Sequence, residues 1–276
     1  MRRACVIGWP IEHSRSPLIH GYWLERYGIE GRYEKLAVPP EDATAFLKGL
    51  EGGGYVGCNV TVPLKEIAFT AVDELEASAR AVGAVNTVWI ENGRLVGANT
   101  DTYGFMTHLD ASAPQWRGRD RPVTLIGAGG AARAIAFGFL AAGVGAVRIV
   151  NRTRERADAL AADLGRRVQA LAWGDLARAV ADAGVVVNTT TIGMKGEGSL
   201  PIDVGDLRPD CIVGDIVYVP LETRLLADAR AAGLATVDGL GMLLHQAAPG
   251  FERWFGVRPE VTAELRARLV ADIEGV

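Results

Sequence analysis

Short runs of β-branched and apolar residues alternate with longer amphipathic stretches along the chain. This alternation predicts an α/β protein whose sheets are mainly parallel. In the first hundred residues, the runs predict strands at 4–8, 33–37, 55–60, 87–91 and 94–98, with helices at 17–27, 43–49 and 64–73. Asn92 and Gly93 join the last two strands. Because Asn-Gly is a strong hairpin signal, we expect that pair of strands to be antiparallel.

A second series of strands and helices follows a polar stretch that contains Pro114, Gly118 and Pro122. This change in composition marks a boundary between two domains. Beyond it, the pattern predicts strands at 123–126, 147–150, 185–188, 212–217 and 235–237, with helices at 131–142 and 154–164. Strands separated by helices in this way are typical of the Rossmann arrangement. From Gly241 onward we expect helices again, and composition does not say which domain they join.

The chain has 276 residues and a formal net charge of −4, so it lacks the positive field that attracts nucleic acid or an anionic membrane. Its longest uncharged apolar run, 134–147, is shorter than the ~20 residues of a transmembrane helix. The apolar stretch near the N-terminus is too short for a signal peptide. The three cysteines and four histidines are scattered, so we expect no metal site and no disulfide framework. These features favour a cytoplasmic protein.

The loop Gly127-Ala128-Gly129-Gly130-Ala131-Ala132 follows a predicted strand and opens a predicted helix, which is the context that a dinucleotide-binding motif requires. Gly127 allows the tight turn, Gly129 lets the backbone approach a pyrophosphate, and Ala132 permits close packing of helix on strand. The helix N-terminus then offers free N–H groups to the phosphates. The loop therefore predicts a bound dinucleotide.

The end of the next predicted strand indicates which dinucleotide is bound. NAD enzymes carry an acidic residue there, which binds the ribose 2′-hydroxyl. This chain has Asn151-Arg152-Thr153-Arg154 and no acid at that point. The Arg152 guanidinium can stack on adenine and bind a 2′-phosphate through two hydrogen bonds, and Thr153 can donate a hydroxyl. A solvated basic loop is the alternative, but the missing acid favours NADP.

Four polar segments in the first half are not required by α/β folding: 8–17, 59–65, 83–87 and 99–101. Each lies beyond the end of a predicted strand or beside a turn. Ligands of open α/β sheets bind outside the carboxyl ends of the strands, so these segments are expected to meet at one site. Hydroxyls, amides, an ammonium and a carboxylate that converge there suit a small polyhydroxylated acid.

Taken singly, these polar residues also have structural explanations. Ser14 or Ser16 could cap the helix predicted to follow them, and Asp101 could cap another helix. Asn86 could be a turn residue. Lys65 could be solvated, as most lysines are.

Taken together, the segments resemble those of the shikimate dehydrogenase family over nearly the whole chain, in the same order and spacing. The shared motifs are H-S-x-S-P at 13–17, N-V-T-x-P-x-K at 59–65, G-A-V-N-T at 83–87, N-T-D at 99–101, G-A-G-G-A-A-R at 127–133, N-R-T at 151–153, D-x-V-Y-x-P-x-x-T at 215–223 and G-x-x-M-L-x-x-Q-A at 239–247. The segment 188–194 departs at two positions from the family's N-A-T-S-x-G-M. One of these changes, Thr for Ser, keeps the hydroxyl.

The resemblance implies roles for the residues at matching positions. Lys65 and Asp101 correspond to the family's catalytic pair. The positions that bind substrate are Ser14, Ser16, Thr61, Asn86, Tyr218 and Gln246. The positions that bind the cofactor are Gly127, Ala128, Gly129, Gly130, Ala131, Asn151, Arg152, Thr153, Arg154, Thr190, Met194 and Gly239. His13 and His20 are expected to be structural.

The family reduces the ring ketone of 3-dehydroshikimate to shikimate with NADPH, in aromatic amino acid biosynthesis, and the resemblance implies this activity. It also implies a substrate domain of residues 1–103 and 240–276, a Rossmann NADP-binding domain of residues 104–239, and a cleft between them. The family includes monomers and homodimers. Two alternatives are a dehydrogenase acting on quinate or an amino analogue of shikimate, and an NADP-sensing module without catalysis. Arg152 argues against the first, since such relatives tend to use NAD; Lys65 and Asp101 argue against the second.

Overall fold

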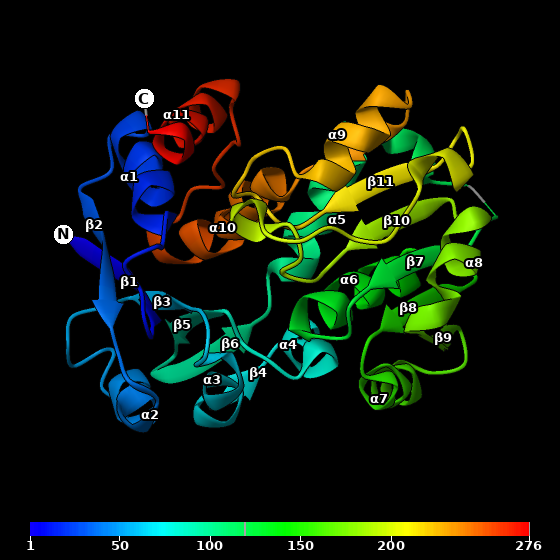
Figure 1. Cartoon of the computed structure of the whole chain (residues 1–276). Coiled ribbons are helices and arrows are strands. Elements are labelled where there is room, and N and C mark those ends of the chain that lie inside the picture. The colour runs from blue at the N-terminus through cyan, green and yellow to red at the C-terminus, as the bar shows by residue number, and fades with distance from the viewer. Residues whose placement is uncertain (119, 276) are drawn as a thin grey trace. The chain divides into compact units, whose positions relative to one another are not determined.

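The computed structural model describes residues 1–118 and 120–275. The chain divides into two units, Met1–Asp101 with Leu244–Val276, and Thr102–Leu243. Each unit has its own six-stranded sheet with helices on its faces (Figure 1).

In the sheet of the first unit, five strands run in one direction and one runs against them. The order is β2-β1-β3-β5-β6-β4. The bounds are β1 (Arg2–Gly8), β2 (Gly31–Ala37), β3 (Gly57–Val60), β4 (Glu74–Leu75), β5 (Thr87–Glu91) and β6 (Arg94–Ala98). Strand β5 pairs antiparallel with both β3 and β6, and every other pair is parallel. The predicted hairpin is confirmed, and β5 is its reversed member.

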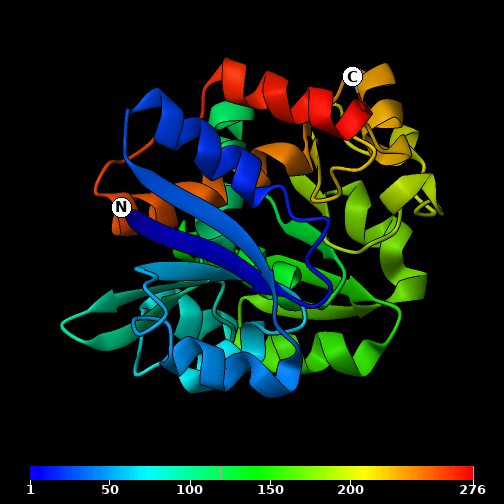
Figure 2. The ribbon, with the colours of Figure 1, turned by 90° about the vertical axis from the view of Figure 1, so that its left-hand side faces the viewer.

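Helices cover both faces of this sheet (Figure 2). They are α1 (Ser16–Arg26), α2 (Pro40–Lys48), α3 (Lys65–Ala71), α4 (Ala77–Val82), the part of α10 (Gly239–Phe255) from Leu244 onward, and α11 (Ala263–Glu274). Helices α1, α10 and α11 lie on one face, and α2 lies on the other. Trp254 of α10 approaches the sheet closely because residue 57 is glycine: a Cβ there would lie 2.0 Å from Trp254 Nε1. That N–H donates to the carbonyl of Val88 at 2.9 Å.

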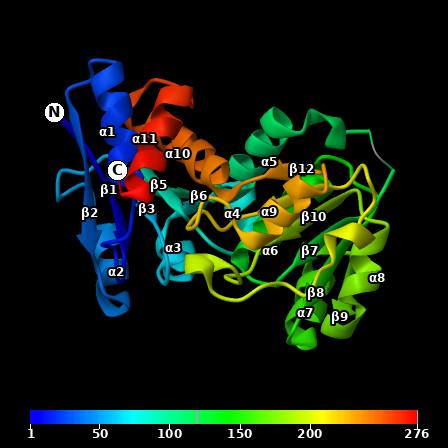
Figure 3. The same cartoon turned by 45° about the horizontal axis from the view of Figure 1, so that its top comes forward.

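The second unit is a parallel sheet of order β12-β11-β10-β7-β8-β9. Its strands are β7 (Val123–Ile126), β8 (Val147–Asn151), β9 (Val168–Ala172), β10 (Val185–Asn188), β11 (Ile212–Asp215) and β12 (Ala235–Val237). The first of them, β7, is central, and the chain builds outward first through β8 and β9 and then through β10 to β12 (Figures 1 and 3). This order is that of the Rossmann fold, and ligands bind where the direction of building reverses, beside β7.

The helices of the second unit are α5 (Asp101–Ser112, from Thr102 in this unit), α6 (Gly130–Ala141), α7 (Arg154–Leu164), α8 (Leu176–Ala181) and α9 (Arg224–Ala231). Two apolar clusters fill the two faces of the sheet. One contains Ile135 and Phe139 of α6, and the other contains Val180 of α8 and Leu226 of α9. Within the described part of the chain, no helix combines the length and apolar character needed to cross a membrane.

Several elements differ from the prediction. The strand expected at 55–60 begins at Gly57, and the one expected at 212–217 ends at Asp215. It ends there because the Asp215 carboxylate accepts a hydrogen bond from Val217 N at 2.9 Å, which turns the chain away from the sheet. Strands β4 and β9 and helices α4, α8 and α9 were not predicted, and α5 was expected only in the alternative in which Asp101 caps a helix. Strand β9 reads Val-Gln-Ala-Leu-Ala, and alanine and glutamine carry little strand propensity.

Candidate active site

The reversed strand β5 gathers the polar segments of the first unit at one edge of its sheet. Because β5 runs against its neighbours, its beginning lies where β3 and β6 end. Thr87 pairs in register with Asn59 of β3 and with Ala98 of β6. Asn86 therefore lies beside the segment 99–101, although it precedes its strand and that segment follows one.

Lys65 and Asp101 form an ion pair at this edge. Lys65 Nζ donates to Asp101 Oδ2 at 2.7 Å, and the side chains are 28% and 14% exposed. Lys65 is the first residue of α3, and Asp101 is the first residue of α5. The backbone N–H of Asp101 donates to Asn99 Oδ1 at 3.0 Å, so the side chain that accepts at the start of α5 is that of Asn99. Lys65 is thus a half-buried partner of a carboxylate rather than a solvated lysine.

The Asn86 side chain binds the other oxygen of the Asp101 carboxylate. Its Nδ2 donates to Asp101 Oδ1 at 2.9 Å, and its Oδ1 accepts from Thr100 N at 2.8 Å. A backbone N–H can only donate, so this contact fixes which end of the Asn86 amide faces Asp101. The carboxylate therefore receives an N–H from Asn86 on one oxygen and the ammonium of Lys65 on the other.

A deeper set of buried polar groups holds the Asn86 amide. Thr87 Oγ1 donates to Asn86 Oδ1 at 3.0 Å. Asn59 Nδ2 donates to Thr87 Oγ1 and to the Asn86 carbonyl, both at 3.1 Å, and Asn59 Oδ1 accepts from Tyr33 OH at 2.6 Å. Burial raises the pKa of Tyr33 well above its usual value, so the phenol keeps its proton and donates. A continuous chain of hydrogen bonds thus runs from Tyr33 to Lys65.

His20 lies at the far end of this chain, and its ring stacks on Tyr33 with centroids 3.9 Å apart. Neither ring nitrogen has a hydrogen-bond partner among the described residues. Burial lowers the pKa of His20 to about 3, so the ring is neutral near pH 7. His20 therefore packs the core next to the polar chain and is not placed to transfer a proton.

The other substrate positions of the first unit lie around this cluster or on nearby loops. Thr100 Oγ1 lies 3.4 Å from Gln246 Oε1 of α10, which brings Gln246 to the cluster. Thr61 follows β3, and its methyl group packs so closely on Gly8 that a Cβ on that glycine would lie 2.6 Å away. Ser14 lies in the loop after β1, and no hydrogen bond joins these loop residues to Lys65 among those described.

Ser16 is the first residue of α1, and the cap position is Arg15. The Ser14 hydroxyl accepts from Ser16 N at 3.4 Å, but no side chain makes a capping hydrogen bond at the cap position. The alternative that Ser16 caps this helix is therefore wrong.

The proposed pyrophosphate loop of the second unit joins β7 to α6. Gly127 has φ +111°, and a Cβ there would lie 2.7 Å from Thr189 Oγ1. A Cβ on Gly129 or Gly130 would meet no atom within 4 Å, and Gly129 caps α6 without any side-chain hydrogen bond. Ala128 and Ala131 complete the loop without polar side chains. The first N–H groups of a 12-residue helix are thus left for an external acceptor, which fits a pyrophosphate.

The predicted 2′-phosphate segment lies at the end of β8. Asn151 Nδ2 donates to the Thr153 carbonyl at 2.8 Å, and Thr153 occupies the cap position of α7 without a side-chain capping bond. Arg154 pairs with Asp158 at 3.0 Å. Arg152 is exposed and pairs with no carboxylate in the described chain. Its charge is available for a phosphate.

Asp215 organises the loops on the other side of β7. Its carboxylate is buried and accepts from Asn188 Nδ2 at 3.0 Å and from Thr223 Oγ1 at 2.8 Å. Burial raises the pKa of Asp215. The Thr190 hydroxyl donates to Asn188 Oδ1 at 2.7 Å and accepts from Ile192 N at 3.1 Å, so it shapes this turn.

Gly239 holds the loop that carries Tyr218. A Cβ on Gly239 would lie 2.2 Å from the Ile216 carbonyl oxygen, so only glycine lets the two backbone segments pack together. Tyr218 follows this contact and is half-buried. Met194, on the loop after β10, is 42% exposed.

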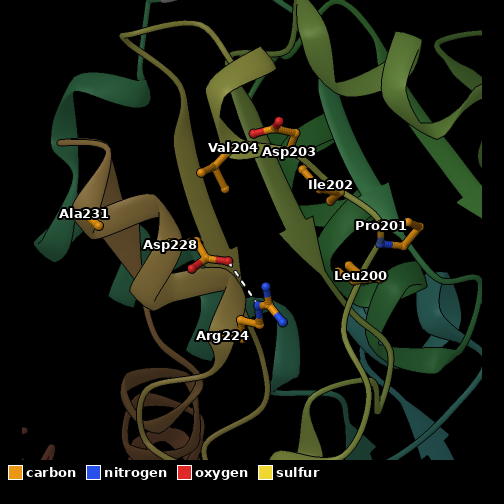
Figure 4. A pocket seen from close by; sticks show the side chains of 8 residues that line it. All are labelled: Leu200, Pro201, Ile202, Asp203, Val204, Arg224, Asp228 and Ala231. Carbon is orange, nitrogen blue, oxygen red and sulfur yellow. Dashed lines mark hydrogen bonds and ion pairs between the residues drawn. The ribbon is translucent and has the colours of Figure 1, made fainter.

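A surface pocket of about 520 Å³ also lies in the second unit (Figure 4). Its polar side chains include Arg224 and Asp228, which pair with each other at 3.4 Å. None of the predicted site residues lines it, so we assign it no part in the site. In residues 1–118 and 120–275, no cluster of three or more His, Cys, Asp and Glu side chains could hold a metal ion.

Four residues of the site were missed by the sequence analysis: Asn59, Thr87 and Thr100, which surround the Asn86 amide, and Tyr33. The first three carried a usable signal, because each is a polar residue within an apolar strand or just after one, at most two positions from a predicted site residue. Tyr33 carried none, since a tyrosine in a strand is ordinary.

Family models match the chain in three places. The shikimate dehydrogenase substrate binding domain matches residues 6–88, the shikimate/quinate 5-dehydrogenase domain matches residues 112–193, and the shikimate 5′-dehydrogenase C-terminal domain matches residues 239–265.

Full-length relatives agree with these matches. The shikimate dehydrogenase (NADP(+)) of Brucella abortus is 54% identical over 275 residues, which cover 99% of this chain and 95% of that protein. The solved shikimate 5-dehydrogenase of Thermus thermophilus, in complex with NADP(H) and shikimate, is 38% identical with a TM-score of 0.87, and the match covers 98% of this chain and 100% of that one. The quinate dehydrogenase of Corynebacterium glutamicum, in complex with NAD, is 32% identical with a TM-score of 0.90, over 98% and 99% of the two chains. The predicted fold class and the resemblance are confirmed: this chain belongs to the shikimate dehydrogenase family.

Proposed function

We propose that the protein catalyses the reversible NADPH-dependent reduction of the ring ketone of 3-dehydroshikimate to shikimate, in the cytoplasm. The observation that carries this proposal is the Lys65–Asp101 ion pair. The Asn86 amide donates to the second oxygen of the Asp101 carboxylate and holds it in place. The names of the full-length relatives, and the NADP(H) bound to the solved Thermus thermophilus relative, support the same reaction and cofactor.

Lys65 and Asp101 are the proposed catalytic residues. The Lys65 ammonium hydrogen-bonds the ketone oxygen and stabilises the negative charge that grows on it as the carbon–oxygen double bond is reduced. Asp101 holds Lys65 in position and accepts a hydrogen bond from a ring hydroxyl of the substrate. The alkoxide oxygen then takes a proton, from Lys65 or through water.

The substrate is proposed to bind mainly to the first unit, in a domain of residues 1–103 and 240–276. The Ser14 and Ser16 hydroxyls bind its carboxylate, and Thr61, Asn86 and Gln246 bind its hydroxyls. Tyr218, carried by residues 104–239, is proposed to contact both the substrate and the nicotinamide.

NADP is proposed to bind to residues 104–239, where it supplies the hydride when bound. The N–H groups of the loop Gly127 to Ala131 hold the pyrophosphate. The segment Asn151 to Arg154 holds the 2′-phosphate of the adenosine, and Thr190, Met194 and Gly239 line the nicotinamide end.

The reaction is tested by following NADP⁺ reduction on addition of shikimate or quinate, and by repeating both assays with NAD⁺. We expect shikimate with NADP⁺ to give the highest kcat/KM. A preference for quinate with NAD⁺ would instead assign the activity of the quinate dehydrogenase, whose fold is equally similar. Binding of NADP⁺ without turnover of either acid would instead support the alternative of a cofactor-sensing module without catalysis.

A further inference from the structure

We propose that Trp173 determines cofactor specificity by holding the Arg152 guanidinium in position for the 2′-phosphate of NADP. The inference rests on the proposed binding of that phosphate by Arg152. Trp173 lies immediately after β9, a strand that the sequence pattern did not reveal, and it is not among the family motifs on which the cofactor site was predicted.

The strand register places the two side chains together. Strands β8 and β9 are parallel neighbours, and their register pairs Asn151 with Ala172, the last residue of each strand. Arg152 and Trp173 are the next residue after each strand, so they leave the sheet side by side at its carboxyl edge.

The Arg152 guanidinium lies over the Trp173 ring, with Cζ 5.3 Å from the ring centroid. Tryptophan is the strongest cation–π partner among the aromatic side chains. The ring itself is anchored, because Trp173 packs partly buried against the apolar cluster that contains Leu171 and Leu176. A fixed ring thus limits the positions of a flexible arginine.

The charge of Arg152 remains available in this arrangement. Nearby Arg154 pairs with Asp158, and Arg133 of α6 pairs with Asp163, so their charges are compensated. No carboxylate in the described chain pairs with Arg152. The contact with Trp173 uses the π face of the ring and none of the guanidinium's hydrogen-bonding capacity for a carboxylate, so the Arg152 N–H groups can form two parallel hydrogen bonds to a phosphate. The opposite face of the guanidinium is left for adenine.

The test compares Trp173→Leu, which removes the ring, with Trp173→Phe, which keeps a weaker one. The probes are 2′,5′-ADP and 5′-AMP, whose dissociation constants are measured by calorimetry. For Trp173→Leu we expect the dissociation constant of 2′,5′-ADP to rise about three- to thirtyfold and that of 5′-AMP to change much less. Trp173→Phe should lie between the wild type and Trp173→Leu. In steady-state assays, the KM for NADPH should rise while that for NADH and for shikimate stays unchanged.

Two further variants complete the design. Trp116→Phe alters another tryptophan of the second unit that carries a stacked arginine, Arg117 at 4.7 Å, and should leave binding of both probes unchanged. The double variant Arg152→Ala with Trp173→Leu should bind 2′,5′-ADP no more weakly than Arg152→Ala alone, because both changes remove one contact.

The proposal is overturned if Trp173→Leu weakens the binding of 2′,5′-ADP and of 5′-AMP by the same factor. The ring would then contribute to the adenine site without selecting for the 2′-phosphate. It is also overturned if neither probe is affected. Failure of the underlying assignment is recognised separately: Arg152→Ala itself would then not discriminate between the two probes.

Discussion

The Asn86 amide nitrogen donates to the Asp101 carboxylate at 2.9 Å, and the amide can take no other orientation because Thr100 N donates to its oxygen at 2.8 Å. Through this contact, groups buried in the sheet reach the ion pair that we propose to be catalytic. The strength of that pair therefore depends on residues that do not touch the substrate.

Lys65→Ala should lower kcat by roughly 10²–10⁴, with a much smaller change in the KM for shikimate. The ammonium meets most negative charge when the ketone becomes an alkoxide, so it contributes more to the transition state than to the ground state. Asp101→Asn should also lower kcat, with a larger effect on KM because Asp101 is proposed to contact the substrate. Lys48→Ala, an exposed lysine at the end of α2, is the control. Near-normal kcat with a raised KM would make Lys65 a substrate anchor.

Thr87→Val should lower kcat/KM for shikimate about three- to tenfold, because it removes the hydroxyl that positions the Asn86 amide, and a buried hydrogen bond contributes about 0.5–1.5 kcal/mol. The lost hydroxyl donates to Asn86 and accepts from Asn59. Thr87→Ser keeps that hydroxyl and should recover most of the activity, and the KM for NADPH should not change in either variant. Equal losses in the two variants would mean that the Thr87 methyl group, not its hydroxyl, is what the site requires.

Arg152→Ala should raise the KM for NADPH ten- to hundredfold and leave that for NADH nearly unchanged, since a charge-assisted contact contributes ~1.5–3 kcal/mol. Steady-state kinetics with both cofactors measures the difference. Arg178→Ala, at an exposed position of helix α8, should change neither constant. An equal rise in KM for both cofactors would show that Arg152 does not bind the 2′-phosphate.

Because His20 is buried in its neutral form, we expect the protein to lose stability in acid. Its pKa is lowered to about 3 in the folded protein, while an unfolded histidine titrates near 6.5. The unfolded state therefore binds the extra proton first, and the free energy of unfolding falls as pH drops below about 6.5. Between about pH 7.5 and pH 5, the titration of this single residue should lower the free energy of unfolding by about 2 kcal/mol.

Urea unfolding of wild type and His20→Phe at the two pH values measures this contribution. Glu34, Asp110 and Asp182 have lowered pKa values because of their arginine partners, and they also lose stabilisation in acid. Their contribution is common to both proteins, so the difference between the slopes reports His20. His13→Gln, at an exposed position, should keep the wild-type slope. Parallel slopes for wild type and His20→Phe would show that His20 titrates normally in the folded state.

The sequence predicted the parts of this protein that depend on local signals. The Gly127 loop, the Asn-Gly turn and the strands of the second unit other than β9 follow from glycine positions, turn chemistry and apolar runs. Strand β9 was missed because its alanines and glutamine pack as a strand only when β8 lies beside them. Tyr33 and Asn59 are 26 residues apart, and the bond that joins them depends on the order of β2, β1 and β3, which no local pattern encodes.

The turn at Asn92 and Gly93, with φ values of 52° and 72°, lies on the exposed tip of the β5–β6 hairpin. It pairs Glu91 with Arg94 and, through the same register, Thr87 with Ala98. Inserting one residue at this tip would shift the pairing by one position and turn the side chains of β5 to the opposite faces of the sheet. The number of residues in this turn, rather than their chemistry, therefore sets the register that brings Asn86 to Asp101.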